Sequence, residues 1–182
     1  MSQFKLVGKN NDVIFSKLVP RNEFCFMELL KSFYKETGLD ESFINLKKSI
    51  ELINQDNGMD IKAILHVEDE SLLRDMSKTF GTKLGHYIRT VPNSEVAEKI
   101  IVKDPSLYSI VLLDKHLPGL DGDKFGIKLK SYNPSIEVCI VTGDPKSVDS
   151  DILKKGIDRV IQKPLSFNIF KNTIGETSKK VA

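Results

Sequence analysis

The 182-residue sequence has no tryptophan, only two cysteines and only three histidines. Cys25 and Cys139 are far apart in the sequence and have apolar neighbours, so we expect no disulfide framework and reduced thiols, as in a cytoplasmic protein. The spacing of His66, His86 and His116 matches no zinc-binding pattern. These scarcities exclude small domains that are held together by disulfides or zinc.

Long hydrophobic runs and a strong charge of one sign are also missing. No apolar run approaches the roughly 18 residues of a membrane-spanning helix, and residues 1–10 lack the basic start and apolar stretch of a secretion signal. The formal net charge of +2 is too small for the electrostatic footprint of a nucleic-acid-binding protein. We therefore expect a cytoplasmic protein with no membrane contact and no direct nucleic-acid binding.

The hydrophobic pattern divides the chain near residue 60, after a turn-forming cluster at residues 54–58. Beyond it, short β-branched runs alternate with amphipathic stretches, which is typical of strand–helix units around a parallel sheet. Residues 61–176 are thus predicted to form an α/β domain with a doubly wound five-stranded parallel sheet, and residues 177–182 a tail. The expected strands are 62–67, 86–91, 108–113, 136–141 and 159–162, and the expected helices begin near Glu70, Ser94, Asp123, Ser147 and Ser166.

The first sixty residues are predicted to be a mostly helical extension. Runs at residues 4–7 and 13–18 can form a small strand hairpin. Residues 22–37 and 40–55 indicate a helical hairpin whose apolar stripes can cover the neighbouring domain, a second copy of the chain in a homodimer, or a partner. The stripes contain Phe26, Leu29, Leu30, Phe33, Phe43, Leu46, Ile50 and Ile53.

Residues suited to phosphoryl chemistry follow four of the five predicted strands. They are the acidic run Glu68-Asp69-Glu70, then Asp114, Thr142 and Lys163. In a doubly wound fold, ligands bind at the carboxyl ends of the strands. Neighbouring carboxylates bind a hard cation such as Mg²⁺, while an ammonium and a hydroxyl neutralise or contact phosphoryl oxygens.

Each of these residues also has an ordinary structural explanation. Acidic residues favour the start of a helix, an aspartate after a strand often forms a cap or turn, and Thr142 before Gly143 fits a turn. Lys163 alone fits a solvated surface charge. The functional interpretation depends on all four positions lying at one edge of the same sheet.

Four motifs carry a resemblance to a known family. They are Ile-Leu-His-Val-Glu-Asp-Glu at 64–70, Val-Leu-Leu-Asp-Lys-His-Leu-Pro-Gly-Leu-Asp-Gly at 111–122, Ile-Val-Thr-Gly at 140–143 and Gln-Lys-Pro-Leu at 162–165. In this order, and with spacings of 45, 28 and 21 residues between Asp69, Asp114, Thr142 and Lys163, residues 61 to about 176 resemble the receiver domain of two-component response regulators, a flavodoxin-like fold.

The resemblance implies roles for these residues. Asp114 would accept a phosphoryl group, Thr142 would be the switch hydroxyl, and Lys163 would follow the fifth strand with a cis bond to Pro164. Mg²⁺ would be held by Glu68, Asp69, Asp114 and the backbone carbonyl of His116. The implied partners are a histidine kinase or phosphotransfer protein and a downstream protein target, and the protein would catalyse only its own phosphorylation and dephosphorylation.

The sequence departs from the family pattern at one position and leaves alternatives open. Val160 stands where the family often has an aromatic residue or histidine, and His116 can shield the phosphoryl group or be an ordinary exposed loop residue. A receiver-like interaction module that takes up no phosphate is one alternative. Another is a haloacid-dehalogenase-type phosphatase, although that family has a second aspartate where this chain has His116.

The origin of the phosphoryl group and the route of output follow from the same resemblance. Residues 1–60 contain no histidine, so we expect the phosphoryl group to come from another protein. Few residues follow position 176, so the chain is expected either to act through protein contacts or to be a fragment that lacks an output domain.

Overall fold

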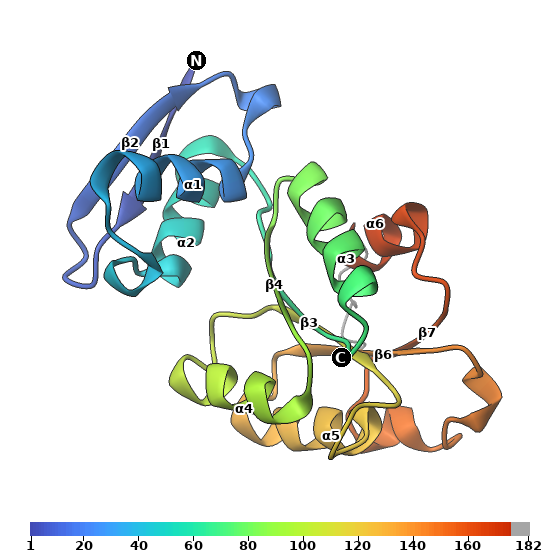
Figure 1. The fold of residues 1–182 in the computed structure, drawn as a ribbon. Coiled ribbons are helices and arrows are strands. Elements are labelled where there is room, and N and C mark those ends of the chain that lie inside the picture. The colour runs from blue at the N-terminus through green and yellow to red at the C-terminus, as the bar shows by residue number, and fades with distance from the viewer. Residues whose placement is uncertain (176–182) are drawn as a thin grey trace. The chain divides into compact units, whose positions relative to one another are not determined.

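The computed structural model describes residues 1–175, and the predicted tail at 177–182 lies outside them. The described chain forms two compact units (Figure 1). One comprises residues 1–63 together with 81–87, and the other comprises residues 64–80 and the described residues from 88 onward. Within residues 1–175, none of the helices has both the length and the apolar character needed to cross a bilayer.

The N-terminal unit combines a strand pair with two helices. Strands β1 (Ser2–Val7) and β2 (Val13–Val19) pair antiparallel, which confirms the predicted strand hairpin. Helices α1 (Phe26–Thr37) and α2 (Leu46–Asn57) follow, and α2 packs against β1. The extension therefore consists of a strand pair and two helices.

Capping residues explain why the second helix begins later than the sequence indicates. Asp40 accepts a hydrogen bond from the amide of Ser42 and caps a separate 3₁₀ turn at Glu41–Phe43. Asn45 then accepts one from the amide of Lys48 at 3.1 Å and starts α2. Short polar side chains of this kind favour helix starts over helix interiors, because they bond the free backbone N–H groups there.

The apolar stripes of both helices are buried inside this unit. Seven of the eight stripe residues are buried, and only Phe43 remains half exposed. Phe4 stacks on Phe24, and Phe26 meets the ring of Tyr87 edge to face. This burial removes the reason for expecting the stripes to bind a second copy or a partner, because their apolar surface already stabilises the unit that carries them.

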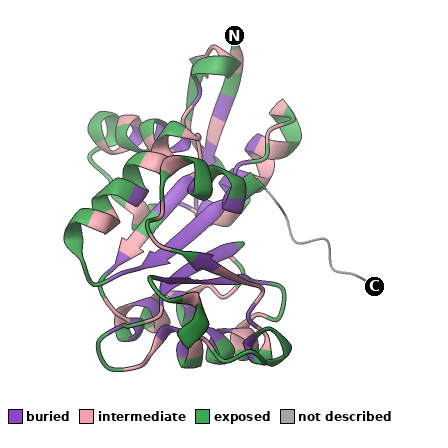
Figure 2. Cartoon of the chain, turned by 90° about the vertical axis from the view of Figure 1, so that its right-hand side faces the viewer, coloured by how far each residue is buried: buried purple, intermediate pink, exposed green. Residues whose placement is uncertain are grey.

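The second unit is built on a five-stranded parallel sheet in the order β4-β3-β5-β6-β7. The strands are β3 (Ala63–Val67), β4 (Tyr87–Val91), β5 (Ile110–Asp114), β6 (Glu137–Thr142) and β7 (Arg159–Gln162). Each lies within two residues of its predicted position. Because β3, β5 and β6 are buried along their whole length (Figure 2), their unbroken apolar runs are those of strands covered on both faces.

Helices cover both faces of the sheet (Figure 1). Helices α3 (Ser71–Lys83) and α6 (Phe167–Gly175) lie on one side, and α4 (Ser94–Lys103) and α5 (Gly122–Tyr132) on the other. The ring of Phe80 on α3 packs edge to face against Phe167 and Phe170 on α6. This arrangement confirms the doubly wound α/β fold.

The helix expected near Ser147 does not form. Two 3₁₀ turns at Pro145–Ser147 and Ile152–Lys155 take its place, with Val148 extended between them. Asp144 accepts a hydrogen bond from the amide of Lys146, and Asp149 accepts one from the amide of Asp151. These local bonds satisfy backbone groups that a continuous helix would otherwise use, so the segment stays irregular.

Candidate functional site

The site lies at the carboxyl edge of the sheet, where four strands deliver the four predicted positions. Glu68 and Asp69 follow β3, Asp114 ends β5, Thr142 ends β6, and Lys163 follows β7. The order β3-β5-β6-β7 places these ends side by side. The sequence-based expectation that they meet at one edge is therefore met by the geometry.

Lys163 is the centre of the hydrogen-bond network. Its Nζ donates to Asp114 Oδ2 at 2.9 Å and to Glu68 Oε2 at 2.9 Å. Lys163 is half-buried, whereas Glu68 and Asp114 are only 1% and 6% exposed. The peptide bond between Lys163 and Pro164 is cis, as the resemblance implies.

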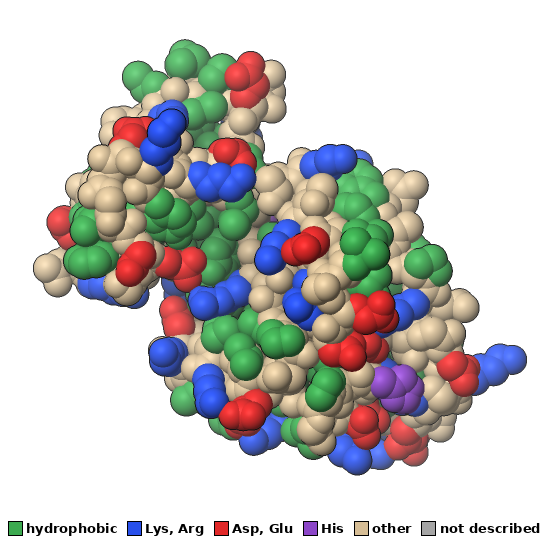
Figure 3. Space-filling view, viewed as in Figure 1, with side chains coloured by type: hydrophobic (Ala, Val, Ile, Leu, Met, Phe, Trp, Pro, Cys, Tyr) green, Lys and Arg blue, Asp and Glu red, His purple; other side chains and the backbone are tan. Residues whose placement is uncertain are grey.

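Three carboxylates gather on one side of this lysine. Ligand atoms of Glu68, Asp69 and Asp114 all lie within 4.8 Å of one another, and Asp69 is exposed. In the space-filling view, acidic side chains cluster beside the start of α3 (Figure 3). Carboxylate oxygens with open access to water are the donor set that Mg²⁺ prefers, so the residues present fit that cation.

Burial and charge act in opposite directions on the pKa values of this network. Burial raises the pKa of the Glu68 carboxyl, and the hydrogen bond from Lys163 offsets that rise only in part. Burial alone would lower the pKa of Lys163, but its hydrogen bonds to Asp114 and Glu68 raise it above the ordinary value. Lys163 is therefore an ammonium at neutral pH, available to pair with negative charge.

Thr142 and the loop after β6 form the other wall of the site. The buried Thr142 hydroxyl accepts a hydrogen bond of 3.2 Å from the amide of Asp144. Lys115, next to Asp114, donates through Nζ to the carbonyl and hydroxyl of Ser147 at 2.6 and 2.5 Å. The loop is thereby tied both to the end of β6 and to the residue after Asp114.

The backbone of His116 contacts the site, whereas its side chain is exposed. Its amide donates to Asp114 Oδ1 at 3.2 Å, so the backbone after Asp114 turns toward the carboxylate. The imidazole is exposed. The placement of the amide keeps the His116 backbone at the site.

Two supporting residues were missed by the sequence analysis. Arg74 donates through Nη1 to the backbone carbonyls of Glu68 at 2.8 Å and Asp69 at 2.6 Å, fixing the turn that carries both carboxylates. At Gly122, a Cβ atom would lie 2.0 Å from the carbonyl oxygen of Asp114, so only glycine allows α5 to start this close to β5. A glycine eight residues after Asp114 was a visible signal, but Arg74 belongs to no motif.

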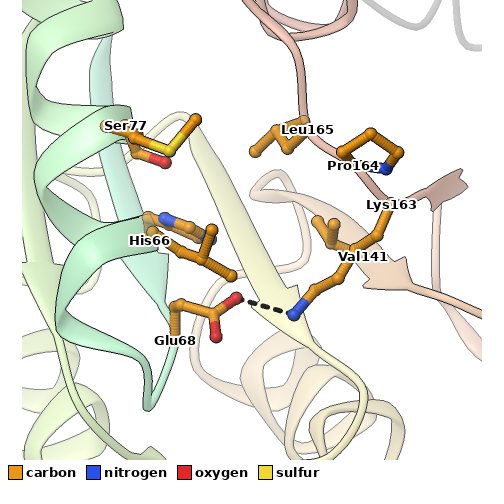
Figure 4. Close-up of a pocket in the computed structure, with 9 residues that line it drawn as sticks. His66, Glu68, Ser77, Val141, Lys163, Pro164 and Leu165 are labelled. Carbon is orange, nitrogen blue, oxygen red and sulfur yellow. Dashed lines mark hydrogen bonds and ion pairs between the residues drawn. The ribbon is translucent and has the colours of Figure 1, made fainter.

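A cavity of about 360 Å³ lies behind this network, on the face of the sheet that carries α3 and α6 (Figure 4). Its walls include His66, two residues before Glu68 on β3. Burial, and to a smaller extent the charge of Lys163, lowers the pKa of His66 to about 4. The motif at 64–70 contains this histidine, but the sequence gives no sign that it is buried beside a cavity.

Comparison with known proteins identifies the second unit. The family model for the response regulator receiver domain matches residues 64–174. A cyclic di-GMP phosphodiesterase of Thermotoga maritima is 29% identical over 116 residues, covering 59% of this chain and 28% of that protein. The autoinducer 1 sensor kinase/phosphatase LuxN of Vibrio harveyi is 20% identical over 117 residues, covering 64% of this chain and 14% of that protein. The chain thus spans under a third of the length of either relative.

Two solved structures with the same fold are receiver domains. A response regulator receiver domain protein from Clostridium thermocellum has a TM-score of 0.58 and 25% identity, covering 63% of this chain and 92% of that one. A CheY-like receiver domain from Methylobacillus flagellatus has a TM-score of 0.58 and 18% identity, covering 64% and 98%. With its motifs, its sheet order and the family match over residues 64–174, this chain belongs to the response regulator receiver domain family.

Proposed function

We propose that the receiver domain is a phosphorylation switch in which Asp114 accepts a phosphoryl group. The single observation that carries this proposal is the pair of 2.9 Å hydrogen bonds from Lys163 to Asp114 and Glu68. They put an ammonium beside a nearly buried carboxylate that ends a central strand. A carboxylate attacks a negatively charged phosphoryl group only when nearby cations offset the repulsion.

The residues of this chain would divide the chemistry as follows. An oxygen of Asp114 forms the new bond to phosphorus while the bond to the donor's histidine nitrogen breaks, and that nitrogen keeps the electron pair. Lys163 pairs with one phosphoryl oxygen, and the Thr142 hydroxyl turns to donate to another. The product is an acyl phosphate on Asp114, and the donor is released as a neutral or protonated histidine.

Mg²⁺ is the cofactor that we propose for this site. Glu68, Asp69 and Asp114 would hold it together with the backbone carbonyl of His116. When bound, the cation would neutralise charge on the phosphoryl oxygens. The raised pKa of Glu68 fits this role, because a buried carboxylate that lacks full compensation gains from a second positive charge.

The partners follow from the same chemistry. A histidine kinase or a phosphotransfer protein would supply the phosphoryl group, and a downstream protein would read the altered surface of the phosphorylated domain. In this proposal the protein catalyses only its own phosphorylation and dephosphorylation. It would do so in the cytoplasm, where such donors act.

The test is a mass measurement on the intact protein after incubation with acetyl phosphate and Mg²⁺. Wild type should gain roughly 80 Da, the mass of one phosphoryl group. Asp114→Asn should gain nothing, and Asp69→Ala should label more slowly and need more Mg²⁺. Asp75→Asn, which changes an aspartate side chain that is 72% exposed on α3, is the matched control and should label like wild type. Equal labelling of Asp114→Asn and wild type would refute the proposal and favour an interaction module that takes up no phosphate.

A further inference from the structure

The cavity of about 360 Å³ behind the candidate site has a defined wall on each side. His66 comes from β3, Met76 and Ser77 come from α3, and Val141 and Leu165 come from β6 and the segment before α6. Figure 4 shows His66, Glu68 and Ser77 facing Val141, Leu165, Pro164 and Lys163 across an open space. Asp114 is not among the lining residues, although its neighbours Glu68 and Lys163 are, so the cavity adjoins the position proposed for phosphorylation without including it.

His66 is a polar side chain in this cavity whose ring nitrogens lack hydrogen-bond partners within the described part of the chain. It is 2% exposed, and neither ring nitrogen has a hydrogen-bond partner among residues 1–175. Glu68 and Lys163 line the same space but bond to each other at 2.9 Å. Leaving a buried polar group unpaired costs stability, and each such group in a folded protein calls for an explanation.

Water alone is a poor occupant. A water molecule takes up about 30 Å³ of liquid and needs two to four polar partners, so filling the cavity would take about a dozen molecules. Most of the lining side chains are apolar, and Leu73, Met76, Val141 and Leu165 offer such a cluster no hydrogen bonds. One water could pair with His66, but most of the volume would remain badly solvated.

The volume and the lining match those of small-molecule sites, which are mostly apolar cavities of about 300 to 1,000 Å³ with a few placed polar groups. A charged ligand is disfavoured, because the two charged side chains in the walls, Glu68 and Lys163, already pair with each other. A neutral imidazole offers one acceptor and one N–H donor.

We propose that this cavity binds a small, uncharged and mostly apolar molecule whose single hydrogen-bonding group pairs with His66. Met76 lines the cavity and is 40% exposed, so the cavity is open to solvent on the side of α3. The inference does not rest on phosphorylation of Asp114, because it follows from the cavity and the unpaired imidazole alone.

Indole is a suitable probe, with 1-methylindole as its matched control. Both are apolar rings, but only indole has an N–H group to donate to His66. Because the chain has no tryptophan, indole fluorescence can be excited at the long-wavelength edge of its absorption, where the four tyrosines do not absorb. For the full chain we expect saturable binding of indole with a dissociation constant of about 0.1–1 mM, as for a ligand of this size. 1-Methylindole should bind roughly fivefold more weakly, because one hydrogen bond is lost.

Two variants locate the binding. His66→Leu should bind indole roughly fivefold more weakly than wild type and bind 1-methylindole unchanged. Ser77→Leu places a larger side chain in the cavity and should abolish binding of both probes, whereas Thr79→Leu, on the exposed side of the same helix, should change neither. Circular dichroism checks that each variant is folded.

Three results would overturn the proposal. They are the absence of saturable indole binding up to its solubility, full indole affinity in folded Ser77→Leu, and equal affinities of wild type for indole and 1-methylindole. None of them bears on the mass gain at Asp114, so failure of this inference is separate from failure of the proposed function.

Discussion

Lys163 Nζ donates a hydrogen bond of 2.9 Å to Asp114 Oδ2, joining the ends of β7 and β5 across the intervening strand β6. The same ammonium bonds Glu68 beyond β5. One cation thus pairs with two carboxylates, which leaves one negative charge uncompensated. Any metal ion that binds these carboxylates shares them with Lys163.

Replacing Lys163 should therefore separate metal binding from phosphoryl uptake. In Lys163→Met the two carboxylates lose their ammonium, so Mg²⁺ affinity measured by calorimetry should rise several-fold. The reason is that about 1 kcal/mol of repulsion between Mg²⁺ and the ammonium is removed, at the effective dielectric constant of a protein surface. Labelling by acetyl phosphate should fall at least tenfold, because one positive group at the phosphoryl oxygens is lost. Lys171→Met, at an exposed position of α6, is the control. Weaker Mg²⁺ binding in Lys163→Met would contradict the competition described above.

Gly122 should be indispensable for the position of Asp114. In Gly122→Ala the new Cβ would lie 2.0 Å from the Asp114 carbonyl oxygen, so β5 or the start of α5 must move. We expect a loss of about 1–3 kcal/mol in unfolding free energy and slower labelling of Asp114. Gly143→Ala, next to Thr142 and with no atom within 4 Å of the added Cβ, should be close to wild type in stability. Similar denaturation curves for the two variants would rule out this steric argument.

The loop after β6 should change when Asp114 is modified. The Thr142 hydroxyl now bonds the Asp144 amide at 3.2 Å, and turning it toward a phosphoryl group breaks that bond. A hydroxyl contact worth about 1–3 kcal/mol shifts a two-state equilibrium roughly 5- to 150-fold. Hydrogen exchange with and without beryllofluoride, a phosphoryl mimic, should show altered protection at residues 143–148 in wild type and none in Thr142→Val. Identical protection in wild type with and without the mimic would argue against switching through this loop.

His86 should make stability depend on pH. Burial, reinforced by the charge of Lys62, lowers the pKa of His86 to about 4, and its Nδ1 accepts a hydrogen bond from the Lys62 amide at 3.2 Å. Between pH 6.5 and 4 the unfolded chain binds a proton that the folded chain does not bind, so stability is complete above pH 6.5 and falls as the pH drops. The expected contribution is about 2 kcal/mol between pH 7 and pH 5.

Urea unfolding of wild type, His86→Gln and His116→Gln at pH 7 and pH 5 measures this dependence. His86→Gln should show a smaller loss on acidification than wild type, because glutamine can accept the Lys62 hydrogen bond without titrating. His116 is exposed, so His116→Gln should lose as much stability as wild type. An unchanged loss in His86→Gln would show that His86 titrates alike in both states.

The sequence by itself determined the strands and the residues that end them. Unbroken apolar runs such as 110–113 and 138–141 specify central strands, because every side chain in them is apolar and favours burial on both faces of the sheet. Once the strands are parallel, their carboxyl ends must share one edge, so the sequence alone predicts that these ends bring together Glu68, Asp69, Asp114, Thr142 and Lys163. Their order and spacing also sufficed to indicate the family.

Only the tertiary structure decided where the helices and turns form between these strands and which cavity they enclose. Two 3₁₀ turns replace the helix expected near Ser147, because the carboxylates of Asp144 and Asp149 accept local hydrogen bonds that compete with helix formation. The difference in free energy between the two conformations is too small for hydrophobic periodicity to predict. The apolar stripes at 22–55 reveal amphipathic helices but not what covers them, and the fold buries them inside the N-terminal unit, with α2 against β1. The unpaired imidazole of His66 and the cavity beside it depend on how α3 and α6 meet the sheet, because a void is a property of packing between distant segments and leaves no mark in sequence order.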